Sequence, residues 1–173
     1  ITDNCYGVAY MKALNKPYES PFFSMFIFAP DYITLLENFN EYMSKTPIAQ
    51  SPPGKTRFYN GRQRKYPVLI LEGSKGPLGI HMAQEKQSPK EAIDKWEKRK
   101  ARMNFDKKDM FVKMDSRDKF TVALGKRFLA LKQFPHKKYR KYFENQTNVI
   151  IMSKYKTMPP IGTLTEKLYP VPV

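Results

Sequence analysis

The sequence predicts an α/β fold, a layered α/β/α arrangement around a mostly parallel or mixed central sheet. Segments with strand and helix patterns interleave along the chain in the order β-α-α-β-β-α-β-α-β. Two of the strand segments are continuous apolar runs, which is typical of strands buried on both faces. The chain of 173 residues, 41% of them apolar, is long enough to bury the core of one domain.

The first part of the chain predicts a short helix over residues 7–14, following a strand that ends near Asp3. Residues 17–28 then predict a loop that runs into an apolar stretch. Pro21 favours this loop because it biases the residue before it toward extended geometry.

The clearest helix is predicted over residues 30–45. Pro30 suits a first helical turn, Asp31 compensates the positive end of the helix dipole, and apolar residues recur at helical spacing. Prolines and a glycine then predict a long loop over residues 47–65.

The middle of the chain predicts a hairpin. Residues 66–71 form a continuous apolar run, residues 73–76 have turn composition, and residues 78–82 form a second strand pattern. A helix is predicted from Ser88 to about Met103, because Ser88-Pro-Lys-Glu is a capping-box start with proline at the first helical position.

The last third predicts a strand over residues 110–114, a helix over 119–133 and a buried strand over 148–153. We expect one α/β domain over residues 1–165, followed by an extended, proline-rich tail over 166–173.

The charge of the chain is strongly positive: 31 Lys and Arg against 16 Asp and Glu give a net charge of +15. The segments 54–65, 95–108 and 126–141 hold 19 of the 31 basic residues. Such a field attracts polyanions, which include nucleic acid, anionic lipid head groups and phosphate-bearing substrates. The alternative is a solvated basic surface with no dedicated partner.

Nucleic acid is the less favoured of these partners. Four aromatic residues between the basic residues of the third segment could stack on single-stranded bases, namely Phe134, Tyr139, Tyr142 and Phe143. The same residues equally suit the buried side of that segment. The sequence has no RNA-recognition, helix-turn-helix or zinc-finger pattern.

Several classes of protein are excluded by composition. One cysteine allows no internal disulfide and no Cys-based zinc site, and two histidines make a His-rich metal centre unexpected. The composition therefore predicts no Cys-based or His-rich metal site, and the sequence assigns no cofactor. No stretch approaches ~20 consecutive apolar residues and no secretion signal is visible, so we expect a cytoplasmic protein that can associate with the inner membrane. Because the chain starts at Ile1, residues upstream are expected to be missing.

Two arginines are the strongest candidates for phosphate binding. Arg99 lies on the apolar face that Trp96 and Met103 define in the predicted helix 88–103, and an inward arginine needs a partner. That partner is either a carboxylate of the core or a bound phosphate. Arg102 follows one turn later, and guanidinium groups match phosphate in a bidentate fashion.

Asn4, Cys5 and Gly7 follow the first predicted strand, at a strand-to-helix turn where main-chain N–H groups and a helix N-terminus favour anions. There the pKa of Cys5 would be lowered, which makes it a candidate nucleophile. The alternative is a buried, inert cysteine. Neither His81 nor His136 has a sequence context that marks it as the base for this thiol.

Asp115-Ser-Arg117-Asp118 follows the predicted strand 110–114. Two carboxylates at such a strand end can supply a general base, with Asp118 the candidate, or bind a metal together with a nucleotide-sugar diphosphate. Arg117 is the adjacent candidate for phosphate. The alternative is a helix N-cap by Asp115 or the serine after it.

Several short motifs fall in an order that resembles one family. They are Asn4-Cys-Tyr-Gly7, Tyr18-x-Ser20-Pro-Phe22, Met25-Phe-Ile27, Asp31-Tyr-Ile33, Leu35-Leu-Glu-Asn38, Tyr66-Pro-Val68 and the block from Glu91-Ala through Trp96, Arg99 and Arg102 to Asn104. Over about residues 1–165 they resemble DUF1919, a bacterial family often labelled exopolysaccharide biosynthesis proteins. The resemblance implies an α/β fold, a role alongside capsule and surface-glycan genes, and substrate binding by the motif residues Tyr18, Ser20 and Asn104.

The sequence departs from the family pattern at several positions. Asp3, Tyr6 and Val8 stand where the family has Asn, Trp and Gly, and a His-Tyr pair is replaced near Gln84-Glu85. If that histidine is catalytic in the family, this member is altered or inactive.

Three hypotheses for the function follow. The first is a transferase of surface-polysaccharide biosynthesis that acts on a phosphate-bearing glycan precursor, either a nucleotide sugar or a lipid-linked sugar. Here Arg99 and Arg102 hold phosphate, Asp118 is base or metal ligand, and the basic face lies against an anionic membrane. The second is a non-catalytic basic module that binds nucleic acid or anionic phospholipid. The third is a structural partner in a glycan-assembly complex, using the loop 47–65 and the tail.

Overall fold

The computed structural model describes residues 8–13, 15–50, 66–83, 87–106, 110, 112–115, 121–131 and 141–144. The expected strands near Asp3 and over 148–153, and the tail 166–173, lie outside these residues.

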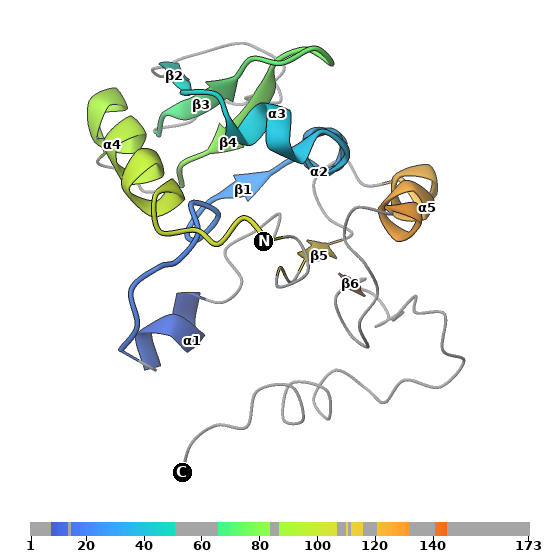
Figure 1. Ribbon diagram of the computed structural model, residues 1–173, viewed down its shortest axis with the longest axis horizontal. Coiled ribbons are helices and arrows are strands. Elements are labelled where there is room, and N and C mark those ends of the chain that lie inside the picture. Colours follow the sequence, from blue (N-terminus) through green and yellow to red (C-terminus); the bar gives the residue numbers. More distant parts are fainter. Residues whose placement is uncertain are drawn as a thin grey trace.

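A four-stranded sheet forms the centre of the described chain (Figure 1). Its strands are β1 (Phe26–Ile27), β2 (Ile48–Gln50), β3 (Val68–Leu71) and β4 (Leu78–His81), in the order β1-β4-β3-β2. All of its pairings are antiparallel. A separate pair, β5 (Val112–Asp115) and β6 (Lys141–Glu144), is parallel, with Val112 opposite Lys141.

The mixed α/β class is confirmed, but the described four-stranded sheet is antiparallel rather than mostly parallel. The order of elements suggested crossovers through helices. Instead, β3 returns directly into β4 through a tight turn, and β1 and β2 pair antiparallel with these two strands. A tight turn between consecutive strands permits only antiparallel pairing. Among the described strands, parallel pairing is confined to β5 and β6.

The predicted hairpin over residues 66–82 is confirmed. The N–H of Gly76 donates to the carbonyl of Gly73 at 2.9 Å, and Gly76 has a φ of 94°, a conformation that favours glycine. The turn is held from outside by helix α3 (Phe39–Met43), in which the Tyr42 hydroxyl donates to the carbonyl of Gly76 at 2.7 Å. Glu41 accepts hydrogen bonds from the main-chain N–H and the hydroxyl of Ser74, at 2.5 and 2.9 Å.

The helix expected over residues 30–45 is two helices, α2 (Ala29–Glu37) and α3, which meet at Asn38. Asn38 has φ −119° and ψ 38°, outside helical geometry, and both its main-chain N–H and its side-chain amide donate to the carbonyl of Thr34, at 3.1 and 3.0 Å. An asparagine side chain that bonds locally to the backbone competes with helix continuation. The interruption turns Tyr42 and Glu41 toward the hairpin.

Asp31 has a second role beyond the expected dipole compensation. Its side chain is buried, and Oδ2 accepts a hydrogen bond at 2.9 Å from the N–H of Gly79 in β4. The carboxylate therefore ties the first turn of α2 to the central sheet.

The described helices also include α1 (Val8–Ala13), α4 (Pro89–Lys100) and α5 (Val122–Ala130). The capping box of α4 is present as predicted: the Ser88 hydroxyl accepts from the N–H of Glu91, and the Glu91 carboxylate accepts from the N–H of Ser88. Helix α4 packs near β2, whereas α2 lies between β4 and α5 (Figure 1). Arg127 of α5 pairs with Glu37 of α2 through two hydrogen bonds of 2.9 and 2.6 Å.

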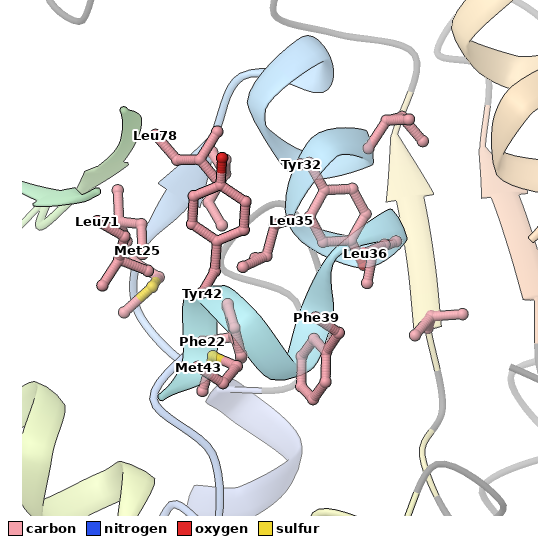
Figure 2. Packing of buried hydrophobic residues seen from close by; sticks show 14 of the residues in the cluster. Phe22, Met25, Tyr32, Leu35, Leu36, Phe39, Tyr42, Met43, Leu71 and Leu78 are labelled. Carbon is pink, nitrogen blue, oxygen red and sulfur yellow. The ribbon is translucent and has the colours of Figure 1, made fainter. Parts of the chain in front are cut away.

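One hydrophobic cluster joins the helices to the sheet (Figure 2). Figure 2 shows its centre, with Tyr32, Leu35, Leu36, Phe39, Tyr42 and Met43 from α2 and α3 directed at the same interior as Phe22, Met25, Leu71 and Leu78. In the described part of the chain, no helix combines the length and the apolar character needed to cross a bilayer.

Candidate functional site

Two surface hollows meet at the C-terminal half of α4. The α4 hollow has a volume of about 530 Å³ and is lined by Gln87, Glu91, Asp94, Lys95, Lys98, Arg99 and Arg102. The α1 hollow has a volume of about 520 Å³ and is lined by Met11, Lys12, Asn15, Lys16, Pro17, Tyr18, Arg99 and Arg102. Arg99 and Arg102 line both hollows, so they form the junction between them.

Helical spacing places Arg99 inside the protein. Trp96 is fully buried and packs edge to face with Phe22 at a ring-centroid distance of 5.5 Å. Arg99 follows it at i+3 on the same helix face and is only 6% exposed. The arginine that the sequence placed on the inward face is therefore buried there.

The partners of Arg99 are a carbonyl and an aromatic ring. Its Nη1 donates to the carbonyl of Phe23 at 2.5 Å, and its guanidinium carbon lies 4.7 Å from the centroid of the Tyr18 ring. Among the residues that the structure describes, no carboxylate pairs with it. Burial lowers the pKa of Arg99, the Tyr18 phenol opposes this effect, and the nearby Arg102 lowers the pKa further.

Arg102 is exposed and bonds to the same loop. Its Nε and Nη2 both donate to the carbonyl of Tyr18, at 3.1 and 3.0 Å. The two arginines thus hold residues 18–23 against α4. Each guanidinium has further N–H donors, and both side chains line the two hollows.

The α4 hollow contains groups of both charges. Lys95 and Lys98 lie on the same side of the helix as Glu91 and Asp94. Burial lowers the pKa of Lys95, the positive charge of Arg99 lowers it further, and Glu91 opposes the shift. The amide nitrogen and oxygen of Gln87 are buried and make no hydrogen bond within the described chain. A buried amide without partners indicates a site that water or a ligand completes.

The α1 hollow is cationic and partly apolar. Lys12 and Lys16 flank Asn15, whose φ of 49° ends helix α1 in the left-handed conformation that asparagine tolerates. The chain then turns through Pro17 to Tyr18, whose ring stacks on Phe23 at 5.0 Å. The described lining of this hollow includes no acidic residue.

The structure brings together three of the site residues expected from sequence, namely Tyr18, Arg99 and Arg102. Ser20 and Asn104 line neither hollow. The Ser20 hydroxyl accepts from the N–H of Phe22 at 3.3 Å, and the Asn104 side chain accepts from the N–H of Asp106 at 2.9 Å, so both shape their own loops.

Five candidates lie outside the described residues, so the proposed roles of these residues remain predictions. They are Asn4, Cys5, Gly7, Arg117 and Asp118.

Sequence reasoning did not select several residues that line the hollows. For Lys95 a signal exists, because it lies at i−4 from Arg99, and Glu91 and Lys98 in turn lie at i−4 and i+3 from Lys95 on the same helix. Lys12 and Lys16 are far from Arg99 in sequence and meet it only through the fold, so nothing local marks them.

His81 lines neither hollow. His81 of β4 is fully buried and stacks on Phe26 at a centroid distance of 4.3 Å, and His136 lies outside the described residues. Within the described residues, no group of His, Cys, Asp and Glu side chains is arranged to hold a metal ion.

Comparison with known proteins gives a family match and a distant relative. Residues 1–167 match the family model described as "Domain of unknown function (DUF1919)". A curated relative from Haemophilus influenzae, described as "Uncharacterized protein", is 29% identical over 121 residues, which cover 70% of this chain and 50% of the relative. The chain therefore spans about half the length of that relative.

Proposed function

We propose that this chain, which belongs to the DUF1919 family, binds a phosphate-bearing glycan precursor at Arg99 and Arg102 and acts as a transferase in surface-polysaccharide biosynthesis. The observation that carries the proposal is the buried guanidinium of Arg99, which has no carboxylate partner among the described residues and opens onto two hollows. A buried cation is costly unless it is paired, and a bound phosphate supplies the missing charge.

The surroundings of Arg99 support an anionic ligand. Lys95 and Lys98 of α4 and Arg102 just beyond its end add positive charge, and Lys12 and Lys16 add it from the α1 hollow. Lys95 is half-buried and the other four are exposed, so its interaction with an anion is the strongest of the five, because the effective dielectric constant falls with burial. The planar, forked N–H donors of an arginine also match the oxygens of a diphosphate better than the compact ammonium group of a lysine does.

In the proposed transfer, an oxygen of the acceptor forms a bond to the anomeric carbon of the sugar while the bond from that carbon to the phosphate oxygen breaks. The proton of the acceptor passes to a base, for which Asp118 is the sequence candidate, and the phosphate leaves with the electron pair. The arginines neutralise the charge that develops on the leaving phosphate. Cys5 is the candidate for a route through a covalent intermediate.

The location proposed for this activity is the cytoplasmic side of the inner membrane. A net charge of +15 favours contact with anionic lipid head groups, where each basic residue near the surface contributes about 1 kcal/mol. This contact would bring a lipid-linked acceptor to the site.

Calorimetry with uridine diphosphate glucose and with pyrophosphate tests the phosphate site. The variant R99A/R102A is expected to show no measurable binding, and R102K is expected to bind about tenfold more weakly because it keeps the charge but loses the fork. The matched control is K90A/K126A, which removes two positive charges from exposed residues that line neither hollow. If the wild type, folded R102K and folded R99A/R102A bind both probes with equal affinity, Arg99 and Arg102 do not form the phosphate site.

Transfer itself is tested by release of uridine diphosphate from the same sugar nucleotide in the presence of an undecaprenyl diphosphate-linked sugar, whose hydroxyl group is the acceptor that gives its proton to the base. We expect D118N to abolish this release without changing binding. Absence of turnover with phosphate binding intact would argue for a binding protein instead.

The second candidate function is a non-catalytic basic module, which the clustered charge favours. It predicts binding to single-stranded RNA or to phosphatidylglycerol vesicles that falls steeply with salt, since phosphate neutralisation releases counterions. Pull-down at two salt concentrations separates the two functions, because K90A/K126A should then weaken binding as much as R99A/R102A does.

A further inference from the structure

The two hollows share Arg99 and Arg102 but differ in the groups that line their outer parts. The α4 hollow adds two carboxylates, two ammonium groups and a buried amide, whereas the α1 hollow adds two lysines, apolar surface and an aromatic ring. A ligand that contacts both hollows therefore meets three chemically distinct regions, namely the two outer linings and the shared arginines.

The carboxylates of the α4 hollow are unfavourable for a simple anion site. Glu91 and Asp94 repel a phosphate held at Arg99, so they would weaken binding if phosphate were the whole ligand. They are favourable beside a polyhydroxylated group, because a carboxylate accepts hydrogen bonds from hydroxyl groups. The Gln87 amide adds a donor and an acceptor that make no hydrogen bond within the described chain. This combination suits a sugar.

The junction suits the phosphates. Arg99 is held in place by the Phe23 carbonyl and the Tyr18 ring, and Arg102 by the Tyr18 carbonyl, so both guanidinium groups are fixed before a ligand binds. Fixing the donors in advance reduces the entropy lost on binding.

The α1 hollow suits the group on the other side of the phosphates. Met11 and Pro17 offer apolar surface, and Lys12 and Lys16 attract the phosphate nearest to them. No acidic residue in the described lining offers an acceptor for sugar hydroxyls here. This surface accommodates an isoprenoid chain or the base of a nucleotide, whose ribose hydroxyls the Asn15 amide can bind, and both are carriers joined to a diphosphate.

We infer that, at the phosphate site of the proposed function, the hollows divide a glycosyl diphosphate between them: the sugar lies in the α4 hollow, the diphosphate at Arg99 and Arg102, and the carrier in the α1 hollow. The orientation is set by Asp94 and Glu91 at one end and by Lys12 and Lys16 at the other.

The variant D94N tests the sugar position, because charge and hydrogen bonding predict opposite signs. Removing a carboxylate from an anion site strengthens the binding of every phosphate probe if Asp94 acts only through its charge. If Asp94 accepts sugar hydroxyls, D94N weakens the binding of uridine diphosphate glucose about tenfold and leaves uridine diphosphate unchanged or slightly tighter. Uridine diphosphate galactose and uridine diphosphate N-acetylglucosamine are measured in parallel. The effect of D94N is judged on the sugar nucleotide that the wild type binds most tightly.

The variant K16A tests the carrier position. It is expected to weaken uridine diphosphate or farnesyl diphosphate several-fold and to leave glucose 1-phosphate unchanged. Whichever of the two diphosphates loses more affinity identifies the carrier as a nucleoside or an isoprenoid. Equal losses for glucose 1-phosphate and for both diphosphates would overturn the assignment of the α1 hollow.

The outcomes separate this inference from the proposed function. If R102K weakens all phosphate probes while D94N tightens or leaves unchanged the sugar nucleotides and uridine diphosphate alike, the phosphate site stands and the division of the ligand is overturned. If R102K, R99A/R102A and the wild type bind pyrophosphate equally, the proposed site fails first. If the wild type binds none of the probes, both are wrong.

Discussion

The guanidinium of Arg99 lies over the ring of Tyr18, with 4.7 Å between the guanidinium carbon and the ring centroid. This contact stands where an ion pair would be expected for an arginine that is 6% exposed. An aromatic face attracts a cation without neutralising it, so the positive charge stays available to a ligand. The relationship allows one residue to hold a loop and, in the function proposed above, to bind an anion.

Replacing Tyr18 with leucine is expected to loosen this contact and to destabilise the protein by about 0.5–2 kcal/mol, the range of cation–π interactions from exposed to desolvated positions. The matched control Tyr18→Phe keeps the ring and should be close to the wild type. Urea denaturation of the three proteins measures the difference. Equal free energies of unfolding for Y18L and Y18F would contradict the stabilising role of the ring.

Replacing Gly73 with alanine is expected to destabilise the hairpin by about 1–3 kcal/mol, as overpacking does. A Cβ at Gly73 would lie 2.6 Å from Cζ of the Tyr42 ring, whose hydroxyl is tied to Gly76. The measurement is a double-mutant cycle with Tyr42→Leu. We expect the cost of G73A to shrink when the ring is absent, whereas additive effects would show that the two residues do not compete for space.

Replacing Asp31 with alanine is expected to cost about 1–3 kcal/mol, because the N–H of Gly79 then loses its acceptor in a buried place. Asp31→Asn retains an acceptor oxygen and should lose less. Thermal unfolding of the two variants shows which of them has lost more stability. A D31A protein as stable as D31N would show that water replaces the carboxylate at no cost.

The capping box predicts an acid-sensitive contribution to stability. The hydrogen bond from the N–H of Ser88 is the main cause that lowers the pKa of Glu91 below its usual value, with the Ser88 side chain second. Because the folded-state pKa is lower than the unfolded one, the stabilisation is complete above the unfolded pKa and is lost as the pH falls through the folded pKa.

The free energy of unfolding of the wild type relative to Glu91→Gln should therefore decline on acidification through this window. Ser88→Ala should reduce the decline, since it removes the side-chain contribution. Parallel curves for all three proteins across acidic pH would refute the linkage.

The hairpin and the start of α4 were predictable because their determinants are local. The turn composition of residues 73–76 and the Ser88-to-Glu91 pattern each act within a few residues, and both features are present in the structure. The break at Asn38 is also local in cause. It was missed because Pro30 and the apolar spacing on both sides of Asn38 fit one continuous helix.

The strand pairing was less predictable, because it depends on contacts distant in sequence. Phe26 lies opposite His81, in a pairing that makes β1 the antiparallel neighbour of β4. The sequence order alone had suggested that neighbouring strands would be parallel. The inward position of Arg99 followed from its spacing to Trp96, but its actual partners, Phe23 and Tyr18, come from a loop that the tertiary fold brings to α4. Helical periodicity shows which way a side chain points and does not show what it meets there.

The lengths of the strands have a consequence for self-association. The two outer strands of the four-stranded sheet, β1 and β2, have 2 and 3 residues, while the inner strands β3 and β4 have 4 each. An outer strand so short presents few free main-chain groups on which a second copy could add a strand. Together with mutual repulsion between copies that each carry +15, this geometry disfavours the addition of a second copy at the described edges of the four-stranded sheet.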